Sequence, residues 1–542
     1  MLIQSLGFIS RVKRRVFLFC LLAGSSSVFA DNKEQTLIIM GSEIETCTTL
    51  SPQFCNIDTP LGNEKGALYS LTPKAIKRLE INWPTDDKSQ LVATVSHLNT
   101  LLKQHPLPLS KQELLWAWRD IASKQLSQLL QIEFDYVIDM LEISHLDGLR
   151  NVFSIDAKNS KKSQDWLTKT YKFIAASLKV KTEKPTLLVI TTAARDPYAS
   201  ANYYETLLSQ TGVALEWLPL TPGLAKALHE KKCEQLDTFR AQAGVHNRAK
   251  VYPKRVAIEQ AACLQGTDKL IKRIKNSTGV ILIGAEFDTA TDQRLRTTLF
   301  DSQGNAYPWT SAIADSSVLV TSGYSGNLLS GGRTQFGPVA TVKPISSLAA
   351  LRGERSVSAG GVGSITFALL DTYFSEQNRT IGLAKSLDAN MQSNGIGIDE
   401  NTSLVVIKSP HENVLTVLGE RGVVHLKSLA KQQFQFNYWP AGTVIEMKKY
   451  GFILSKRSID KALPTVKIPP LPMLRFDKIL TDAKLRSLTQ AMCLSNEQSA
   501  VGQQDEFIVS FDAAKNTQYH RINSSSYGCA IEQLKLTITT IQ

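Results

Sequence analysis

The sequence predicts an α/β protein built on a parallel sheet, and two observations indicate this class. Short apolar runs of strand length pass into glycine or polar residues at TLIIMGSE (36–43), PTLLVITTAARDP (185–197) and TGVILIGAE (278–286). A helical pattern at 198–212 and another apolar run, VALEWLPL, lie between the second and third of them. Strands that alternate with helices are typical of parallel sheets, in which each strand is buried on both faces.

A long helical segment interrupts this alternation at residues 60–180. Apolar residues recur there at three- and four-residue spacing in SQLVATVSHLNTLLKQ, KQELLWAWRDIASKQLSQLLQ and SQDWLTKTYKFIAASLKV. We expect a helical insert. The predicted core then comprises residues 31–59 and 181–430, with further inserts near 222–270 and 301–350. Short β-rich runs predict a small β-rich extension over 431–542.

The first 30 residues have the pattern of a secretory signal peptide. A basic stretch, RVKRR, precedes the apolar run VFLFCLLAG, and Val28 and Ala30 form a small-x-small cleavage pattern. We expect cleavage after Ala30 and a periplasmic or secreted protein. No later segment is long and uncharged enough to span a membrane.

The cysteines agree with export. Of the seven cysteines, Cys20 lies in the signal peptide. An even number in an exported chain favours disulfides, and proximity in sequence suggests the pairs Cys47–Cys55, Cys233–Cys263 and Cys493–Cys529. No CxxC or HExxH motif occurs, so neither a metal nor another cofactor is predicted.

The charge pattern disfavours nucleic acid as a partner. The net charge is +12, four of the positive charges belong to the signal peptide, and the rest are spread along the chain. Nucleic-acid binding is typical of dense Lys/Arg stretches interleaved with aromatics. The pattern indicates no more than a mild attraction to acidic partners, and the oligomeric state is not predicted.

The stretch GERSVSAGGVGSITFALLD (353–371) contains a candidate nucleophile. A catalytic serine on a sharp strand-to-helix turn needs small neighbours, because the backbone is strained and the helix packs closely. Ser358 has such neighbours, with Ser356 and Gly360 at the two glycine positions of a G-x-S-x-G elbow, and an apolar run of helical length follows. The helix N-terminus would offer N–H groups to an oxyanion. Two interpretations stay open: a nucleophile, or a serine in a structural turn.

Two downstream blocks carry a family resemblance. DTYFSEQNR (371–379) and GIGIDENTSLVV (395–406) resemble blocks of the cyanophycinase family of serine peptidases, and VLGERGVVHL resembles the strand pair that follows. The early apolar runs resemble the first strands of that family. The resemblance covers about half of the chain. It implies a class I glutamine amidotransferase-like α/β core.

The resemblance also implies a set of site residues. The family uses a Ser–His–Glu triad, for which Ser358 matches the nucleophile and Glu400 the residue that orients the base. Positions that match the substrate side of the family's site are Gln293, Asp371 and Arg379. Tyr373 stands at the position of the family's histidine. Tyrosine, with an ordinary pKa near 10, is a poor base.

Two functions follow from these residues. The first is an exported serine-type peptidase or hydrolase that cleaves a peptide or isopeptide bond through an acyl-enzyme on Ser358. The alternative is an inactive family member that binds a peptide or partner in the cell envelope. The identity of the base distinguishes them, and the histidines that could replace the missing one are His145, His246, His411 and His425.

Overall fold

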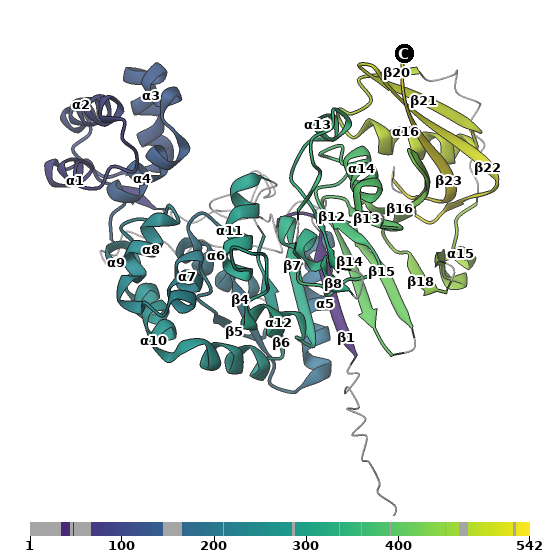
Figure 1. Cartoon of the computed structure of the whole chain (residues 1–542), viewed down its shortest axis with the longest axis horizontal. Coiled ribbons are helices and arrows are strands. Elements are labelled where there is room, and N and C mark those ends of the chain that lie inside the picture. Colours follow the sequence, from purple (N-terminus) through teal and green to yellow (C-terminus); the bar gives the residue numbers. More distant parts are fainter. Residues whose placement is uncertain are drawn as a thin grey trace, which may run out of the picture.

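The computed structural model describes most of the chain after the N-terminal segment. The described residues are 34–43, 47, 67–144, 165–209, 211–284, 288–334, 337–358, 360–390, 392–410, 412–449, 451–464, 475–523 and 527–541. The predicted signal peptide and Cys55 lie outside them. Figure 1 shows a central sheet region with a group of helices at one end and a second sheet at the other.

The first sheet is mixed and has nine strands, in the order β19-β18-β15-β14-β1-β7-β6-β4-β5. Its parallel part consists of β1 (Gln35–Met40), β7 (Val318–Ser322), β6 (Gly279–Leu282), β4 (Thr186–Ile190) and β5 (Ala214–Trp217). Antiparallel strands continue it on the other side of β1: β14 (Thr402–Lys408), β15 (Asn413–Gly419), β18 (Val444–Lys448) and β19 (Gly451–Leu454). The predicted α/β class with parallel strands is therefore confirmed.

Helices cover both faces of the parallel strands, which explains their continuous apolar sequences. The helices that pack on one face are α5 (Asp165–Lys181) and α6 (Pro197–Ser209). Those on the other face are α7 (Pro222–Glu230), α10 (Pro253–Asn276), α11 (Thr289–Leu299) and α12 (Pro308–Ala314). The short helices η4 (Cys233–Gln235), α8 (Leu236–Gln242) and α9 (Arg248–Val251) lie between α7 and α10 in the chain.

A separate group of helices, here called the helical unit, has a hydrophobic core of its own. It comprises α1 (Pro73–Arg78), α2 (Lys88–Gln104), α3 (Lys111–Gln128) and α4 (Gln131–Leu141), with β2 (Leu68–Tyr69) and β3 (Leu109–Ser110). Leu98, Leu114 and Trp118 are fully buried in this core. The expected insert over 60–180 is wrong at its end, because Ile174 and Leu178 of α5 pack on the main sheet instead.

The second sheet has eight strands, in the order β12-β13-β16-β17-β23-β22-β21-β20. The strands are β12 (Leu369–Asp371), β13 (Asn394–Ile398), β16 (Gly422–Ala430), β17 (Gln433–Pro440), β20 (Arg475–Asp477), β21 (Ser499–Gln504), β22 (Phe507–Arg521) and β23 (Cys529–Thr540). It packs against α14 (Thr380–Asn390), which joins the parallel strands β12 and β13, and α16 (Lys484–Ser495).

Two expected boundaries are wrong. The tail from 431 is rich in strands, as predicted, but it is not a separate extension, because β17 pairs with β16, and β18 and β19 complete the first sheet. The segment 301–350 is not an insert outside the core, because it contains the central strand β7. After β7 come η5 (Gly323–Leu329), β8 (Gly332–Thr334), β9 (Gly337–Val339), β10 (Thr341–Val342) and α13 (Ser347–Leu351).

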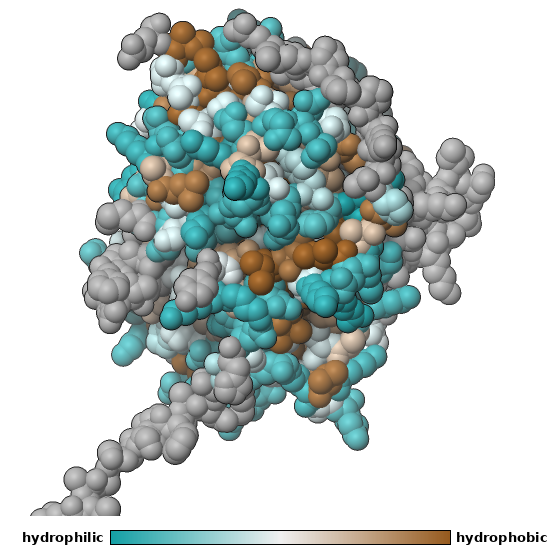
Figure 2. All heavy atoms as spheres, turned by 90° about the vertical axis from the view of Figure 1, so that its right-hand side faces the viewer, coloured by the Kyte–Doolittle hydropathy of each residue, from teal (hydrophilic) through white to brown (hydrophobic). Residues whose placement is uncertain are grey.

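The disulfide pairs Cys233–Cys263 and Cys493–Cys529 are those that the sequence suggested. Cys47 is disulfide-bonded as well, and the Cys47–Cys55 pair stays a prediction. Two bridges fit an oxidising compartment. Among the described helices, none is long and apolar enough to cross a membrane. Figure 2 shows a largely hydrophilic face with hydrophobic residues in separate groups.

Candidate functional site

The carboxyl ends of four strands from the two sheets meet at one place, here called the four-strand junction. It comprises Gly41–Glu43 after β1, Ser322–Gly323 at the end of β7, Thr372–Tyr373 after β12 and Asp399–Glu400 after β13. The Gly323 N–H donates to the Ser42 carbonyl at 3.1 Å, and the Tyr373 N–H donates to the Gly41 carbonyl at 2.7 Å. A Cβ on Gly41 would lie 2.1 Å from the Asp399 carbonyl oxygen, so glycine allows this close approach.

A sharp strand-to-helix turn does occur at this junction, but it lies at Gly323 rather than at Ser358. β7 ends at Ser322, Gly323 has a φ of 52°, and η5 begins there. A nucleophile elbow has this course, with its reactive side chain on the strained residue. Gly323 has no side chain, so the elbow carries no nucleophile. Ser325, two residues later, is fully buried and donates to the Leu282 carbonyl at 2.8 Å.

The predicted helix after Ser358 is wrong. Ser358 ends the short strand β11 (Val357–Ser358), which pairs with β10, and the next element is the strand β12. Gly360 and Gly363 have φ values of 83° and 76°, which a right-handed helix does not accommodate. The Val362 N–H donates to the Leu328 carbonyl at 2.7 Å, so this backbone pairs with η5. Among the described residues, the Ser358 hydroxyl makes no hydrogen bond.

Tyr373, at the position where the resemblance expected a histidine, has a structural contact. Its hydroxyl accepts a hydrogen bond from the Glu43 N–H at 3.1 Å, and its φ is 52°. The buried Tyr204 lies nearby, where burial and then the Glu43 carboxylate raise the pKa of Tyr204 well above 10. Tyr373 therefore connects the end of β12 to the end of β1.

Glu400 lies at the junction, but its carboxylate faces the guanidinium of Arg421. Its Oε2 is 3.5 Å from Arg421 Nη1, and its backbone N–H donates to Glu376 Oε2 at 2.9 Å. Glu376 also pairs with Arg421 and Arg486. No hydrogen bond joins Glu400 to Ser358 within the described chain. The arrangement therefore neutralises charge between the two sheets.

Asp371 and Arg379 form a buried ion pair. Arg379 Nε lies 3.0 Å from Asp371 Oδ2, and both residues are at most 1% exposed. Asn327 Nδ2 donates to the same carboxylate at 3.0 Å. Burial raises the pKa of Asp371 to about 6, and Arg379 opposes this rise. The two residues that matched substrate-side positions thus contact each other within the core.

Gln293 is exposed on α11 and lines a cavity of about 640 Å³. The other walls come from α4, α7, α8 and the loop after β4, with Arg195 and Lys226 among the lining residues. This cavity is separate from the junction, since its lining includes none of the residues that define the four-strand junction. The structure therefore does not bring Gln293 together with Ser358 or Tyr373.

The described histidines provide no base for a serine. His425 is buried, bonds through its ring to Asn394 at 3.1 Å and Asn437 at 2.7 Å, and stacks on Trp439. Burial lowers the pKa of His425 to about 3. Across the described residues, no histidine ring hydrogen-bonds a serine, threonine or cysteine side chain. His145 and His411 lie outside those residues.

An acidic cluster links the helical unit to the α/β body. Carboxylate oxygens of Asp139, Glu142 and Asp196 lie within 4.8 Å of one another. Arg248 is bonded to all three, at 3.2 Å to Asp139, at 2.8 Å to Glu142 and at a shorter distance to Asp196. The guanidinium thus occupies the place between the carboxylates that a cation would take. The sequence did not reveal this cluster, because its members lie up to about a hundred residues apart.

The turn at Gly323 has a signal in the sequence, within the segment 301–350 that was expected to be an insert. VLVTS is an apolar run, and SGYSG supplies small residues after it. Those are the features of a strand followed by a sharp turn.

The fold and the junction together define a mixed α/β protein whose two sheets meet at the carboxyl ends of their strands. No known family matches the sequence, and no curated protein is similar to it. Among solved structures, it is similar to a peptidase from an acI-B1 Actinobacterium, with 19% sequence identity and a TM-score of 0.32. The likeness covers 53% of this chain and 93% of that one.

Proposed function

We propose that this protein is an exported, non-hydrolytic relative of the cyanophycinase-like serine peptidases that binds peptides. The class I glutamine amidotransferase-like core belongs to the same proposal. The chain has the parallel sheet, the elbow and the carboxylate-bearing turn after β13, while no hydrogen bond among the described residues joins Ser358 to Glu400 or to Tyr373. A serine hydroxyl needs a base within hydrogen-bond reach to attack a carbonyl near neutral pH.

The observation that carries the proposal is the elbow after β7. This strand-to-helix turn, with its positive φ, is where a nucleophile would stand, and its residue is Gly323. The residue on the strained turn, Gly323, has no side chain, and the Tyr373 hydroxyl accepts a hydrogen bond from the Glu43 N–H, so neither can act as the nucleophile or base that the resemblance implies. Binding without hydrolysis is the function that this geometry supports best.

A serine-directed fluorophosphonate probe tests the absence of hydrolysis. We expect no labelling of the wild-type protein at Ser358, and the same background for Ser358→Ala. An active serine peptidase labelled in parallel is the positive control. Incubation with a mixed peptide library, followed by mass spectrometry, should show no cleavage.

Labelling and cleavage that depend on Ser358 would contradict the proposal. Labelling that disappears in Ser358→Ala but stays in Ser325→Ala, together with peptide cleavage, would establish the serine peptidase and exclude the non-hydrolytic role. Binding is measured separately, with the wild-type protein and the same peptide library. Peptides that are retained intact support the proposal.

A further inference from the structure

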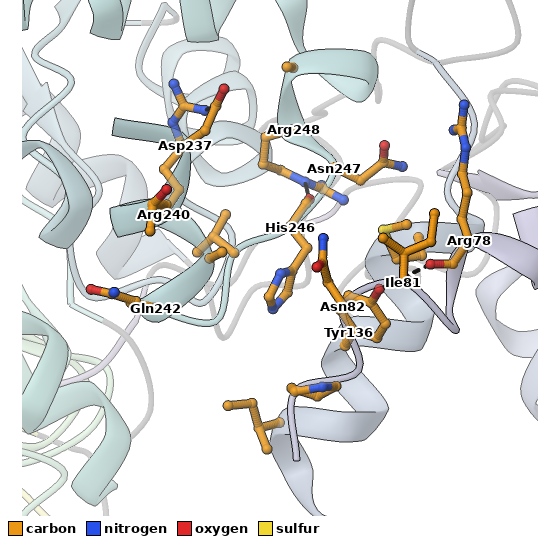
Figure 3. Close-up of a pocket in the computed structure, with 17 residues that line it drawn as sticks. Arg78, Ile81, Asn82, Tyr136, Asp237, Arg240, Gln242, His246, Asn247 and Arg248 are labelled. Atoms are coloured by element: carbon orange, nitrogen blue, oxygen red, sulfur yellow. Dashed lines mark hydrogen bonds and ion pairs between the residues drawn. The ribbon is translucent and has the colours of Figure 1, made fainter. Parts of the chain in front are cut away.

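A cavity outside the junction lies between the helical unit and the α/β body, and is here called the interdomain cleft. Its volume is about 830 Å³, which is within the range that holds small ligands. Figure 3 shows that one wall comes from the helical unit, with Arg78, Ile81, Asn82 and Tyr136, and the other from α8 and the loop before α9.

The two walls have different chemistry. The wall of the helical unit presents apolar side chains beside Arg78 and Asn82. Two of the apolar side chains, Ile81 and Ile132, are 71% and 41% exposed. The opposite wall is polar and carries Arg240, Gln242 and His246. A ligand that fills this cleft must therefore combine an apolar group with a polar or charged one.

The polar wall is rigidly built around Asp139 of α4. The His246 N–H donates to Asp139 Oδ2 at 2.9 Å, and Asn247 Nδ2 donates to the Asp139 carbonyl at 3.0 Å. Asn247 has a φ of 54°, a conformation that costs free energy and persists where its surroundings enforce it. The ring of His246 packs edge-on against Tyr136, with the ring centroids 4.9 Å apart. The imidazole is thus held in one orientation.

Two groups of the cleft have unused hydrogen-bonding capacity. His246 Nε2 is buried and has no hydrogen-bond partner among the described residues. Arg78, at the end of α1, makes no ion pair within the described chain. The other two arginines are occupied, Arg248 by the acidic cluster and Arg240 by Glu259 and Asp237. Arg78 and His246 are therefore the groups that a ligand can satisfy.

We infer that the interdomain cleft binds the C-terminus of a short peptide, with the terminal carboxylate at Arg78, an apolar last side chain against Ile81 and Ile132, and the preceding peptide backbone at His246. A carboxylate next to an apolar side chain matches the wall of the helical unit, where Arg78 lies beside Ile81, and a peptide backbone matches the polar wall. Hydrogen bonds from charged donors to carboxylates are the strong ones, and the amides of Asn82 and Gln242 suit a peptide backbone. The inference rests on the proposed peptide-binding function, for which it supplies a site and a ligand class.

Fluorescence polarisation with a labelled Ala-Ala-Ala-Leu peptide tests the ligand chemistry. The free acid should bind the full-length protein, and the C-terminal amide should bind at least about tenfold more weakly, because it lacks the charge. Equal binding of acid and amide overturns the inference. Absence of binding up to about 1 mM does so as well. Decanoate that binds where the peptide does not would identify a fatty acid instead.

Paired variants test the location. Arg78→Gln should weaken the free acid about tenfold, while Lys77→Gln, an equal change of charge on the same helix but outside the lining, should stay within about twofold. Ile81→Ser should weaken binding about threefold or more, against Val92→Ser, which is similarly exposed at 68% on α2. All four substitutions are at exposed or half-buried positions, so the fold is preserved. Unchanged binding in Arg78→Gln overturns the site.

The two proposals fail in different ways. Fluorophosphonate labelling at Ser358 excludes the non-hydrolytic function whatever the cleft binds. Peptide binding that is insensitive to Arg78→Gln and Ile81→Ser leaves that function intact and excludes only the cleft.

Discussion

The four-strand junction and the interdomain cleft differ in how their polar groups are used. At the junction, Tyr373 holds the backbone of Glu43, Glu400 faces Arg421, and Asp371 pairs with Arg379. In the cleft, His246 Nε2 has no partner in the described chain, and Arg78 forms no ion pair there. These junction side chains thus bond to other parts of the same chain, while the cleft has groups that a ligand can complete.

This difference shows that position in the fold and capacity for binding are separate properties. The carboxyl ends of parallel strands are the usual place for ligands in α/β proteins. Here the convergence of two sheets fills that place with ion pairs and close backbone contacts. The added helical unit creates a cleft at its boundary with the body, and boundaries of this kind are common binding sites.

Among substitutions that distinguish the two regions, Arg248→Met is expected to cause the largest loss of stability. This substitution leaves the carboxylates of Asp139, Glu142 and Asp196 without their shared cation, and breaking a buried ion pair costs about 3–5 kcal/mol. We expect loss of peptide binding in the cleft and a lower midpoint in chemical denaturation. A change below about 1 kcal/mol would contradict the role given to Arg248.

The next effect concerns the disulfide that supports the polar wall. Cys233 and Cys263 are 30 residues apart in the sequence, and removing such a bridge should lower the free energy of unfolding by about 3–4 kcal/mol. The double variant Cys233→Ala/Cys263→Ala, compared with the wild type by thermal denaturation, measures this. Equal stability of the two proteins would show that η4 and α10 are held by packing alone.

At the junction, the free energy of unfolding is expected to depend on pH, by an amount similar to or smaller than the contribution of the disulfide. The pKa of Asp371 is raised from 3.8 to about 6, so the folded state binds the proton more tightly than the unfolded state. Stability from this group is present below pH 4 and is lost as the pH rises through 6, by about 3 kcal/mol.

Comparison with Asp371→Asn isolates this contribution. The variant lacks this titration. As the pH rises from 4 to 7, the unfolding free energy of the wild type should therefore fall relative to that of the variant. A difference that is constant over this range would show that Asp371 is ionised throughout.

The smallest of these effects is expected for Gly326→Ala near the junction. A Cβ there would lie 2.9 Å from Ile39 Cγ2 and 3.1 Å from Thr372 Cγ2, closer than ordinary contacts. We expect a loss of about 1–3 kcal/mol from overpacking and unchanged affinity for the peptide in the cleft. A parallel fall in affinity would show that the two regions are coupled.

Much of the secondary structure could be predicted from local pattern. The apolar runs around Ile38, Leu188 and Ile281 are buried strands, and the three helical patterns within 60–180 are helices. The apolar run after Ser358 was assigned to a helix because its composition suits one. Its backbone instead bonds to η5 and continues into β12, which no local pattern reports.

The candidate site was less predictable than the fold. Ser358, Glu400 and Tyr373 were grouped through a resemblance in short blocks, and the structure joins Tyr373 and Glu400 to other partners. Gly323 was overlooked because a glycine in a Gly/Ser-rich stretch indicates a loop as readily as an elbow. The position of β7 in the middle of the sheet shows that this glycine belongs to an elbow and not to a loop.

Periodicity and spacing along the chain were enough to predict the class of fold, the helices α2, α3 and α5, and the cysteine pairs Cys233–Cys263 and Cys493–Cys529. Tertiary structure alone decided the use of the polar residues. Arg248 meets Asp139, Glu142 and Asp196, and His246 meets Tyr136, only after the helical unit packs on the body. Charge pairing and unfilled hydrogen bonds depend on distances in space, and sequence separation does not encode those distances.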